Sequence, residues 1–206
     1  MSRFSERIPR LILASQSTAR KKLLEDLGVK VTAMATFCDE SFSLSEPEET
    51  VRSLAQRKLD FFIREHPENP LPVLCCDTLI LFKGRLIGKA KDQDEAFGQL
   101  SSFSGERQDV VTGWALSLEG KVQSGSDRAS VWFKDLDERT IREYLSTNEW
   151  KGAAGSYRIQ SLGKNLIDHI NGDFSTVVGL PLLQISDILS RTVPGCVGAE
   201  FPSLRG

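Results

Sequence analysis

The sequence predicts a single α/β domain built on a mixed sheet. Apolar segments of strand length alternate with segments of helical periodicity along the chain, which is typical of α/β folds. Two strand segments, 110–118 and 122–133, flank a Glu119-Gly120 turn, so part of the sheet should be antiparallel. No repeat, low-complexity tract or linker-like change of composition divides the 206 residues. We therefore expect one domain over 1–206, with an irregular tail over 195–206.

The first third of the chain predicts two strands and two helices. An apolar strand ending at Ala14 runs into a helix that should stop near Gly28, and residues 29–35 alternate well enough to form a second strand. A polar loop follows, and Pro47 then opens a long helix. The apolar positions of this helix recur about every 3.6 residues and share one side: Val51, Leu54, Ala55, Leu59, Phe62 and Ile63.

The middle of the chain predicts a buried strand and a capped helix. Residues 71–81 form an apolar run of strand length, and a turn at 83–85 sends the chain back toward this strand. Asp92 and Glu95 have the spacing of a capping box, which starts a helix running to about Ser102.

Beyond the hairpin, the chain predicts two further helices separated by a loop. Asp137 should cap a helix that runs through about Leu145. Residues 152–160 form a loop of small residues that allows close backbone approach. A short apolar segment at 174–179 precedes a last helix, which should end by Pro194.

Composition and charge argue against nucleic-acid and membrane partners. The chain is 40% hydrophobic and 26% charged with a net charge of −2, so it lacks a global basic field. A single-stranded nucleic-acid module would need aromatic residues among basic ones, but Trp114, Trp132 and Trp150 lie apart. No apolar run reaches the ~18 residues needed to cross a bilayer, and the first residues lack the apolar core of a secretion signal. We expect a cytoplasmic protein.

The cysteines and histidines do not predict a metal centre. Cys38, Cys75, Cys76 and Cys196 contain no Cys-x-x-Cys pair, so a structural zinc site is not expected. Cys75 and Cys76 belong to an apolar strand, where buried reduced thiols are the ordinary state. His66 and His169 are too few for histidine-based ligation.

The start of the first long helix predicts an anion site. Ser15 and Ser17 precede three consecutive cations, Arg20, Lys21 and Lys22, at a helix end that already carries partial positive charge. Backbone N–H groups, serine hydroxyls and Arg20 together suit a phosphate. The alternative is a serine-capped surface helix with solvated lysines.

Asp77 is a carboxylate in the middle of an apolar strand. An ionised carboxylate left unpaired in such a place costs several kcal/mol, so Asp77 should meet water, a metal, a cation or a ligand. A purely structural role is the alternative.

Several short blocks follow one another along the chain from Leu11 to the last helix. They are Leu13-Ala14-Ser15 with Arg20 and Leu23-Leu24, Asp39-Glu40, Leu54-Ala55 with Lys58, Asp77-Thr78, Gly88-Lys89 with Glu95-Ala96, Thr112-Gly113, Ala154-Gly155-Ser156-Tyr157-Arg158-Ile159-Gln160, and Val177-Val178-Gly179-Leu180-Pro181. In this order they resemble the Maf family of nucleoside-triphosphate pyrophosphatases.

The resemblance implies a fold, a reaction and a cofactor. The fold would be a long twisted mixed sheet flanked by helices, with two lobes around a cleft, similar to inosine-triphosphate pyrophosphatases. The reaction would cleave a nucleoside triphosphate between its α- and β-phosphates, with a divalent cation such as Mg²⁺, Mn²⁺ or Co²⁺. The Tyr-x-Ile-Gln end of the small-residue loop is similar to the subgroup that acts on dTTP and UTP, and a homodimer would be typical.

The resemblance also implies roles for particular residues. Asp77 would be catalytic and would bind the metal, with Glu40 as the second carboxylate. The expected phosphate-binding residues are Ser15, Arg20, Lys58 and Lys89. The positions expected to select the base are Ala19, Thr78 and Gln160.

Three positions depart from the family pattern. Pro-Arg-Arg is replaced by Thr18-Ala19-Arg20, which removes one charge-assisted hydrogen bond worth roughly 1.5–3 kcal/mol unless Lys21 or Lys22 substitutes. Gly-Ala before the aspartate becomes Cys75-Cys76, which should add bulk near the cleft floor, and the usual histidine before Thr-Gly is Gln108. These departures leave a second hypothesis, a nucleotide-binding regulatory protein of the septum-formation type with little turnover.

Overall fold

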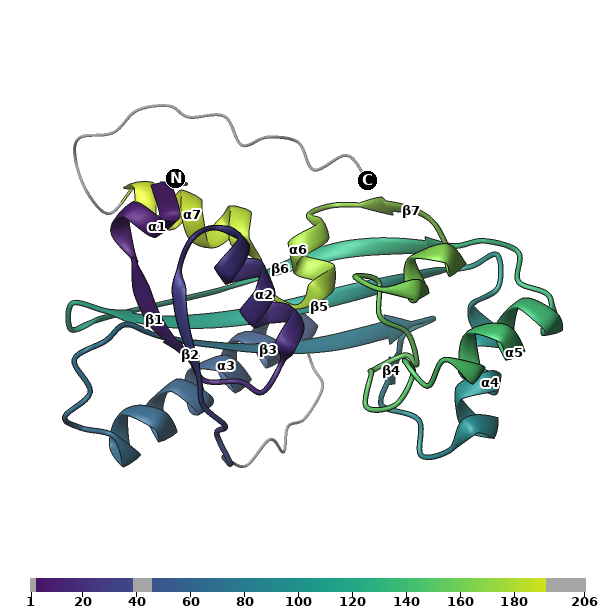
Figure 1. The fold of residues 1–206 in the computed structure, drawn as a ribbon, viewed down its shortest axis with the longest axis horizontal. Helices are drawn as coiled ribbons and strands as arrows, with labels where there is room; N and C mark the ends of the chain where they lie inside the picture. Colours follow the sequence, from purple (N-terminus) through teal and green to yellow (C-terminus); the bar gives the residue numbers. More distant parts are fainter. Residues whose placement is uncertain (1–2, 39–45, 192–206) are drawn as a thin grey trace.

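The computed structural model describes residues 3–38 and 46–191, and its centre is a seven-stranded mixed sheet (Figure 1). The strands are β1 (Arg10–Leu13), β2 (Lys30–Ala33), β3 (Val73–Phe82), β4 (Arg85–Ile87), β5 (Arg107–Leu118), β6 (Lys121–Phe133) and β7 (Ile167–Asn171). They lie in the order β2-β1-β3-β5-β6-β7, with β4 beside β3. Strands β2 and β3 run parallel to β1, and the other pairs are antiparallel. The predicted mixed α/β sheet is confirmed.

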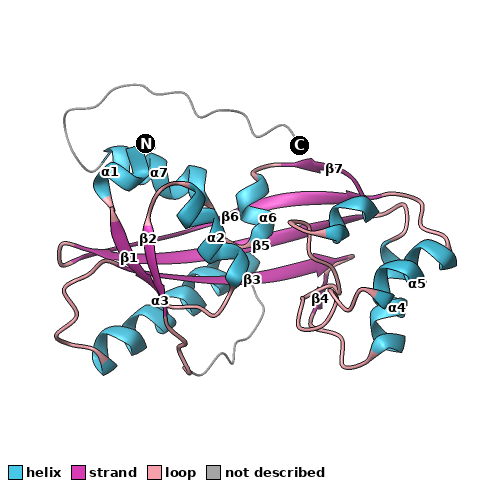
Figure 2. Ribbon diagram, in the orientation of Figure 1, coloured by secondary structure: helices cyan, strands magenta, loops and turns pink. Residues whose placement is uncertain are grey.

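Helices cover both faces of the sheet (Figure 2). They are α1 (Arg3–Arg7), α2 (Thr18–Asp26), α3 (Pro47–Glu65), α4 (Gln93–Phe103), α5 (Glu138–Ser146), α6 (Phe174–Val178) and α7 (Leu182–Arg191), with a 3-10 turn at Leu162–Leu166. Side chains along β1 point alternately to the two faces of the sheet. Leu11 and Leu13 pack with α1, α2 and α7, whereas Ile12 packs with α3.

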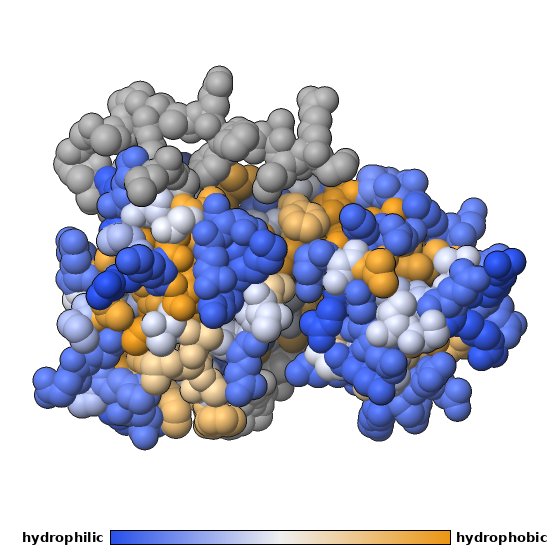
Figure 3. Space-filling view, viewed as in Figure 1, coloured by the Kyte–Doolittle hydropathy of each residue, from blue (hydrophilic) through white to orange (hydrophobic). Residues whose placement is uncertain are grey.

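The far half of the long strands carries a second lobe. Helices α4 and α5 and the loop around Trp150 and Tyr157 pack there on a core that includes Phe103 and Phe133. Because β3, β5 and β6 run through both lobes, the two lobes share one sheet (Figure 1). On the face drawn in Figure 3, hydrophilic residues cover most of the surface, with smaller hydrophobic patches among them. Helices in the described ranges are all too short or too polar to span a bilayer.

Local capping signals are where the sequence predicts them. Asp92 accepts from the Glu95 N–H at 2.8 Å, and the Glu95 carboxylate accepts from the Lys91 N–H at 2.9 Å, which forms the start of α4. Asp137 likewise caps α5 through the Thr140 N–H at 2.7 Å.

The structure also contains elements that the sequence did not predict. Helix α1, edge strand β7 and the single-turn helix α6 fall in short segments with little periodicity of their own. Helices α1 and α6 form because they pack on the sheet, as Phe4 of α1 and Thr176 of α6 do, and β7 forms because it pairs with β6. The predicted irregular tail over 195–206 lies outside the described residues, and the single domain over 1–206 stays a prediction.

Candidate active site

The candidate site lies where one edge of β3 has no neighbouring strand. β1 pairs with β3 only as far as Leu13 opposite Leu74, and β4 joins the same edge only from Ile80. Between them, this edge of β3 pairs with no strand of the described chain, while the other edge stays paired with β5. A pocket of about 650 Å³ opens at this gap and is lined from both lobes. Asp77 and Thr78, which point to opposite faces of β3, therefore both reach it.

The N-terminus of α2 forms one wall of this pocket. All residues from Ser15 to Arg20 line it. Ser17 caps α2 by accepting from the Arg20 N–H at 3.3 Å, and Ser15 accepts from the Ser17 N–H at 3.2 Å. The predicted strand, hydroxyl turn and helix start therefore face a cavity, as an anion site requires.

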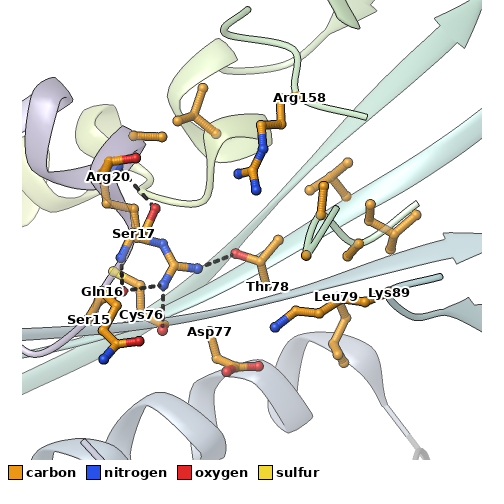
Figure 4. Close-up of a pocket in the computed structure, with 18 of the residues that line it drawn as sticks. Ser15, Gln16, Ser17, Arg20, Cys76, Asp77, Thr78, Leu79, Lys89 and Arg158 are labelled. Carbon is orange, nitrogen blue, oxygen red and sulfur yellow. Dashed lines mark hydrogen bonds between the residues drawn. The ribbon is translucent and has the colours of Figure 1, made fainter. Parts of the chain in front are cut away.

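The Arg20 guanidinium is held across the open edge of β3 (Figure 4). Its Nη1 donates to the Ser15 hydroxyl at 3.3 Å and to the Cys76 carbonyl at 3.1 Å, and its Nη2 donates to the Thr78 hydroxyl at 2.9 Å. The Cys76 carbonyl is able to accept because no strand covers this edge. Arg20 Nε is buried and has no hydrogen-bond partner among the described residues.

Asp77 meets a cation, which is one of the partners that its place in an apolar strand requires. Its carboxylate forms an ion pair with Lys58 Nζ of α3. The two side chains are only 14% and 11% exposed, so water screens this pair much less than a surface pair. Figure 4 shows the Asp77 carboxylate on the pocket side of α3.

The second lobe contributes a cation and an amide. Lys89 follows β4, and its backbone forms an isolated bridge with Ala154, while the Gly155 N–H donates to the Gly88 carbonyl at 3.1 Å. These bonds fix the small-residue loop at the mouth of the pocket. The Lys89 side chain reaches toward Asp77 (Figure 4), and Gln160 lines the pocket from the same loop.

Arg158 is a pocket residue that the sequence analysis did not single out. Its side chain points into the cavity (Figure 4), while Nε donates to the Glu149 carbonyl and Nη2 to the Lys151 carbonyl, both at 2.9 Å. An arginine in a loop of small residues was the available signal, but only the folded loop shows that it faces α2.

The three consecutive cations of α2 separate in the structure. Arg20 lines the pocket, but Lys21 and Lys22 form surface ion pairs with Glu25 at 3.6 Å and Asp26 at 2.9 Å. Neither lysine lines the pocket in the described structure, so neither is placed to substitute for the missing arginine. The alternative, a serine-capped surface helix with solvated lysines, describes Lys21 and Lys22 but not Arg20.

Ala19 itself lines the pocket and is partly exposed. A longer side chain at this position therefore has room to extend toward a bound anion. The position where alanine replaces the family's arginine therefore lies at the pocket and not on the outer face of α2.

The other two departures lie on or behind the pocket wall. Cys76 lines the pocket, whereas Cys75 packs under α3 on the opposite face of β3, so the prediction of added bulk at the cleft floor is wrong for Cys75. Burial raises the pKa of the Cys76 thiol to about 11. The buried Gln108 donates to the hydroxyl of Tyr157, whose pKa burial also raises.

The Asp77 carboxylate is the group in the pocket that suits a hard cation. The hydroxyls of Ser15 and Thr78 accept from the Arg20 guanidinium, and that of Ser17 caps α2. No group of three histidine, cysteine, aspartate or glutamate residues lies together within the described ranges. The described residues therefore supply a metal ion in this pocket with one carboxylate, that of Asp77. Mg²⁺ commonly takes one or two carboxylates and fills its other positions with water and phosphate oxygens. Glu40, the predicted second ligand, lies outside the described residues.

Comparisons with known proteins identify the family of the chain. A family model described as "Maf-like protein" matches residues 10–192. A dTTP/UTP pyrophosphatase of Halalkalibacterium halodurans is 39% identical over 184 residues, covering 89% of this chain and 92% of that protein. A dTTP/UTP pyrophosphatase of Pyrococcus furiosus is 32% identical over 180 residues, covering 87% and 94%.

A solved nucleoside-triphosphatase / dITP/XTP pyrophosphatase from Mycobacterium abscessus covers 60% of this chain and 74% of its own at 16% identity, with a TM-score of 0.34, a likeness too weak to say more. The family model, by contrast, spans most of the chain, and the relatives align over nearly their whole length. The chain belongs to the Maf family.

Proposed function

We propose that the protein hydrolyses nucleoside triphosphates, with dTTP and UTP as the main substrates, to the nucleoside monophosphate and pyrophosphate. The observation that carries this proposal is the convergence of Arg20, Lys58, Lys89 and Asp77, from four separate parts of the chain, on one pocket. The relatives named dTTP/UTP pyrophosphatase support the choice of substrate. Modified pyrimidine nucleotides would also fit a house-cleaning role.

The charge of the pocket suits a triphosphate. A triphosphate carries about four negative charges. Four cations line the pocket, Arg20, Lys58, Lys89 and Arg158, and Asp77 offsets one of them, so together with the N-terminus of α2 they would balance most of that charge. Ser15 would donate its hydroxyl to a phosphate oxygen. The same cations would stabilise the charge that develops on the departing pyrophosphate.

Asp77 is the proposed general base. Its carboxylate would accept a proton from the attacking water, whose oxygen bonds to the α-phosphorus while the bridging oxygen leaves with the β- and γ-phosphates. The ion pair with Lys58 keeps the carboxylate in one orientation before substrate arrives.

A divalent cation, Mg²⁺, Mn²⁺ or Co²⁺, would be held by Asp77, with Glu40 as the proposed second ligand and phosphate oxygens as the others. When bound, it supplies Lewis-acid polarisation of the phosphate and a lower pKa for a bound water. The residues of the chain would orient the triphosphate with or without it.

Three lining residues are proposed to select the base. Gln160 has both donor and acceptor groups that suit a pyrimidine edge, and Thr78 offers a hydroxyl. The side chain at position 19 would influence which nucleotides fit, since Ala19 leaves room at the N-terminus of α2.

A nucleotide panel tests the proposal. The protein would be incubated with the common and several modified triphosphates in the presence of Mg²⁺, Mn²⁺ or Co²⁺, and pyrophosphate release would be measured. Faster release from dTTP and UTP than from purine nucleotides is expected. Binding without release under every metal would instead favour the regulatory hypothesis.

Two broader expectations belong to the same proposal. The protein would act in the cytoplasm, where its nucleotide substrates are, and would form a homodimer. Light scattering coupled to gel filtration measures the second, and a mass equal to one chain would contradict it.

A further inference from the structure

A buried threonine behind the pocket connects to Arg20 through hydrogen bonds. Thr112 of β5 is fully buried and does not line the pocket in the described structure. Its hydroxyl donates to the Thr176 carbonyl at 2.9 Å and lies 2.9 Å from the Thr78 hydroxyl. Thr78 in turn accepts from Arg20 Nη2 at 2.9 Å. Four groups from α2, β3, β5 and α6 thus form one chain, which we call the threonine relay.

Counting protons gives this relay a direction. A threonine hydroxyl has a single proton, and a carbonyl can only accept. The Thr112 hydroxyl donates its proton to the Thr176 carbonyl, so in its hydrogen bond with Thr78 it must be the acceptor. The Thr78 proton therefore points away from the pocket, and only an oxygen lone pair of Thr78 faces Arg20.

The far end of the relay is itself fixed. The Thr176 hydroxyl donates to the Asp127 carboxylate of β6 at 2.5 Å, and Thr176 is fully buried. Gly179, which ends α6, lies against the guanidinium: a Cβ there would be 2.9 Å from Arg20 Nε and from the Thr78 hydroxyl oxygen. Arg20 is therefore confined between β3 and the end of α6.

We propose that Thr112 is a positioning residue for Arg20, acting through Thr78. By holding the Thr78 proton, Thr112 keeps a lone pair available to Nη2 and fixes the plane of the guanidinium before a triphosphate arrives. Such preorganisation lowers the cost of binding, because fewer groups have to be ordered. This inference rests on the proposed function, in which Arg20 binds phosphate.

The relay also limits how Thr78 can meet a nucleotide. With its proton committed to Thr112, Thr78 can only accept a further hydrogen bond from the pocket. Uracil and thymine carry an N3–H donor, whereas N3 of cytosine is an acceptor. A contact of Thr78 with ring position 3 thus favours uracil and thymine, because the donor of cytosine is its exocyclic amine at position 4.

Two variants of Thr112 separate positioning from packing. Thr112→Val keeps the shape but removes the hydroxyl, whereas Thr112→Ser keeps the hydroxyl but removes a buried methyl group. We expect Thr112→Val to raise the KM for dTTP by about tenfold with little change in kcat, since one hydrogen bond to a charged group is weakened. Thr112→Ser keeps both hydrogen bonds and should keep the wild-type KM, although loss of a buried methyl group lowers its Tm. Equal KM values for wild type and Thr112→Val, or an equal rise of KM in Thr112→Val and Thr112→Ser, would overturn the proposal.

A double-mutant cycle tests whether Thr112 acts through Arg20. In an Arg20→Ala background the relay has nothing to position, so adding Thr112→Val should leave KM unchanged. Full additivity of the two substitutions would show that Thr112 acts elsewhere.

A spectroscopic readout keeps this inference apart from the proposed function. The side-chain ¹⁵N–¹H signals of Arg20, identified by their loss in Arg20→Lys, should show slow guanidinium rotation in wild type and in Thr112→Ser, and faster rotation in Thr112→Val. If no nucleotide is hydrolysed, the proposed function is contradicted while these spectra stay the same. If the Arg20 signals are identical in wild type and both Thr112 variants, the threonine relay is contradicted.

Discussion

At the scale of single residues, the site depends on how buried polar groups find partners. Asp77 sits in an apolar strand and meets Lys58, while Arg20 is held by Ser15, Thr78 and a carbonyl that no strand covers. Each contact satisfies a group whose burial alone would cost free energy. The same contacts leave the charged atoms facing one pocket, so the stability of the site and its proposed chemistry come from the same residues.

Asp77→Asn should nearly abolish turnover while leaving triphosphate affinity largely intact. The amide cannot accept a proton from water, and loss of a general base typically costs about 10²–10⁴-fold in rate. Pyrophosphate release at saturating dTTP measures kcat, and calorimetry measures affinity. Asp60→Asn, an exposed position on α3, is the matched control. Wild-type turnover in Asp77→Asn would remove Asp77 from the mechanism.

Ala19→Arg should lower the KM for dTTP by about tenfold, because it adds a charge-assisted hydrogen bond at a position that lines the pocket. Lys21 and Lys22 are engaged with Glu25 and Asp26, so they do not already supply this contact. Ala19→Leu adds bulk without charge and serves as the control. A KM that is unchanged or raised by the arginine would mean that the natural substrate has no phosphate near position 19.

At the scale of secondary-structure elements, α3 is positioned by its close approach to β5. A Cβ at Gly113 would lie 2.2 Å from the carbonyl carbon and oxygen of Val51, so β5 has no room for a side chain there. Since α3 carries Lys58 and β3 carries Asp77, this contact sets the distance between the two layers that form the ion pair. Gly113 thus affects the site without touching it.

Gly113→Ala should destabilise the fold by about 1–3 kcal/mol and also lower activity, because α3 must move away from the sheet. Chemical denaturation measures the free energy of unfolding, and pyrophosphate release measures activity. Gly98→Ala in α4 has no atom within 4 Å of the added Cβ, so this control should be neutral or more stable by up to about 1 kcal/mol. Equal stability of the two variants would contradict the close packing of α3 on β5.

At the scale of the whole molecule, one sheet joins two lobes and carries the pocket between them. The described cysteines of β3 report on the integrity of this sheet, since Cys75 and Cys76 are buried on its opposite faces. Burial raises the pKa of both thiols, that of Cys76 to about 11, so near neutral pH they are protonated as well as inaccessible.

Alkylation of Cys75 and Cys76 by iodoacetamide at pH 8 should therefore occur only when the sheet opens. Raising the pH toward 10 should accelerate their reaction in the native protein far less than it does for a free thiol, because access remains closed. Mass spectrometry of peptides across a urea series measures both sites, with the partly exposed Cys38 as the internal reference. Labelling of Cys76 in native protein as fast as Cys38 would show that the pocket floor opens without unfolding.

Much of the fold and part of the site followed from local sequence. The hairpin at Glu119-Gly120 and the caps at Asp92 and Asp137 depend on residues next to each other in the chain, and all are present. The short elements α1, α6 and β7 could not be predicted, because their stability comes from packing on the sheet or, for β7, from pairing with β6, and not from their own periodicity.

The sequence by itself determined which groups exist. They are a lone carboxylate in an apolar strand, a basic helix start and lysines on separate elements, and all three follow from residue type and spacing. Only the tertiary structure decided where they point. Strands β1 and β4 leave one edge of β3 unpaired, and Arg20 donates to the Cys76 carbonyl there. Arg158 lines the same pocket, held by the Glu149 and Lys151 carbonyls, whereas Lys21 pairs with Glu25 on the surface. Hydrogen bonds such as those of the threonine relay join residues far apart in the chain, so no local pattern specifies them.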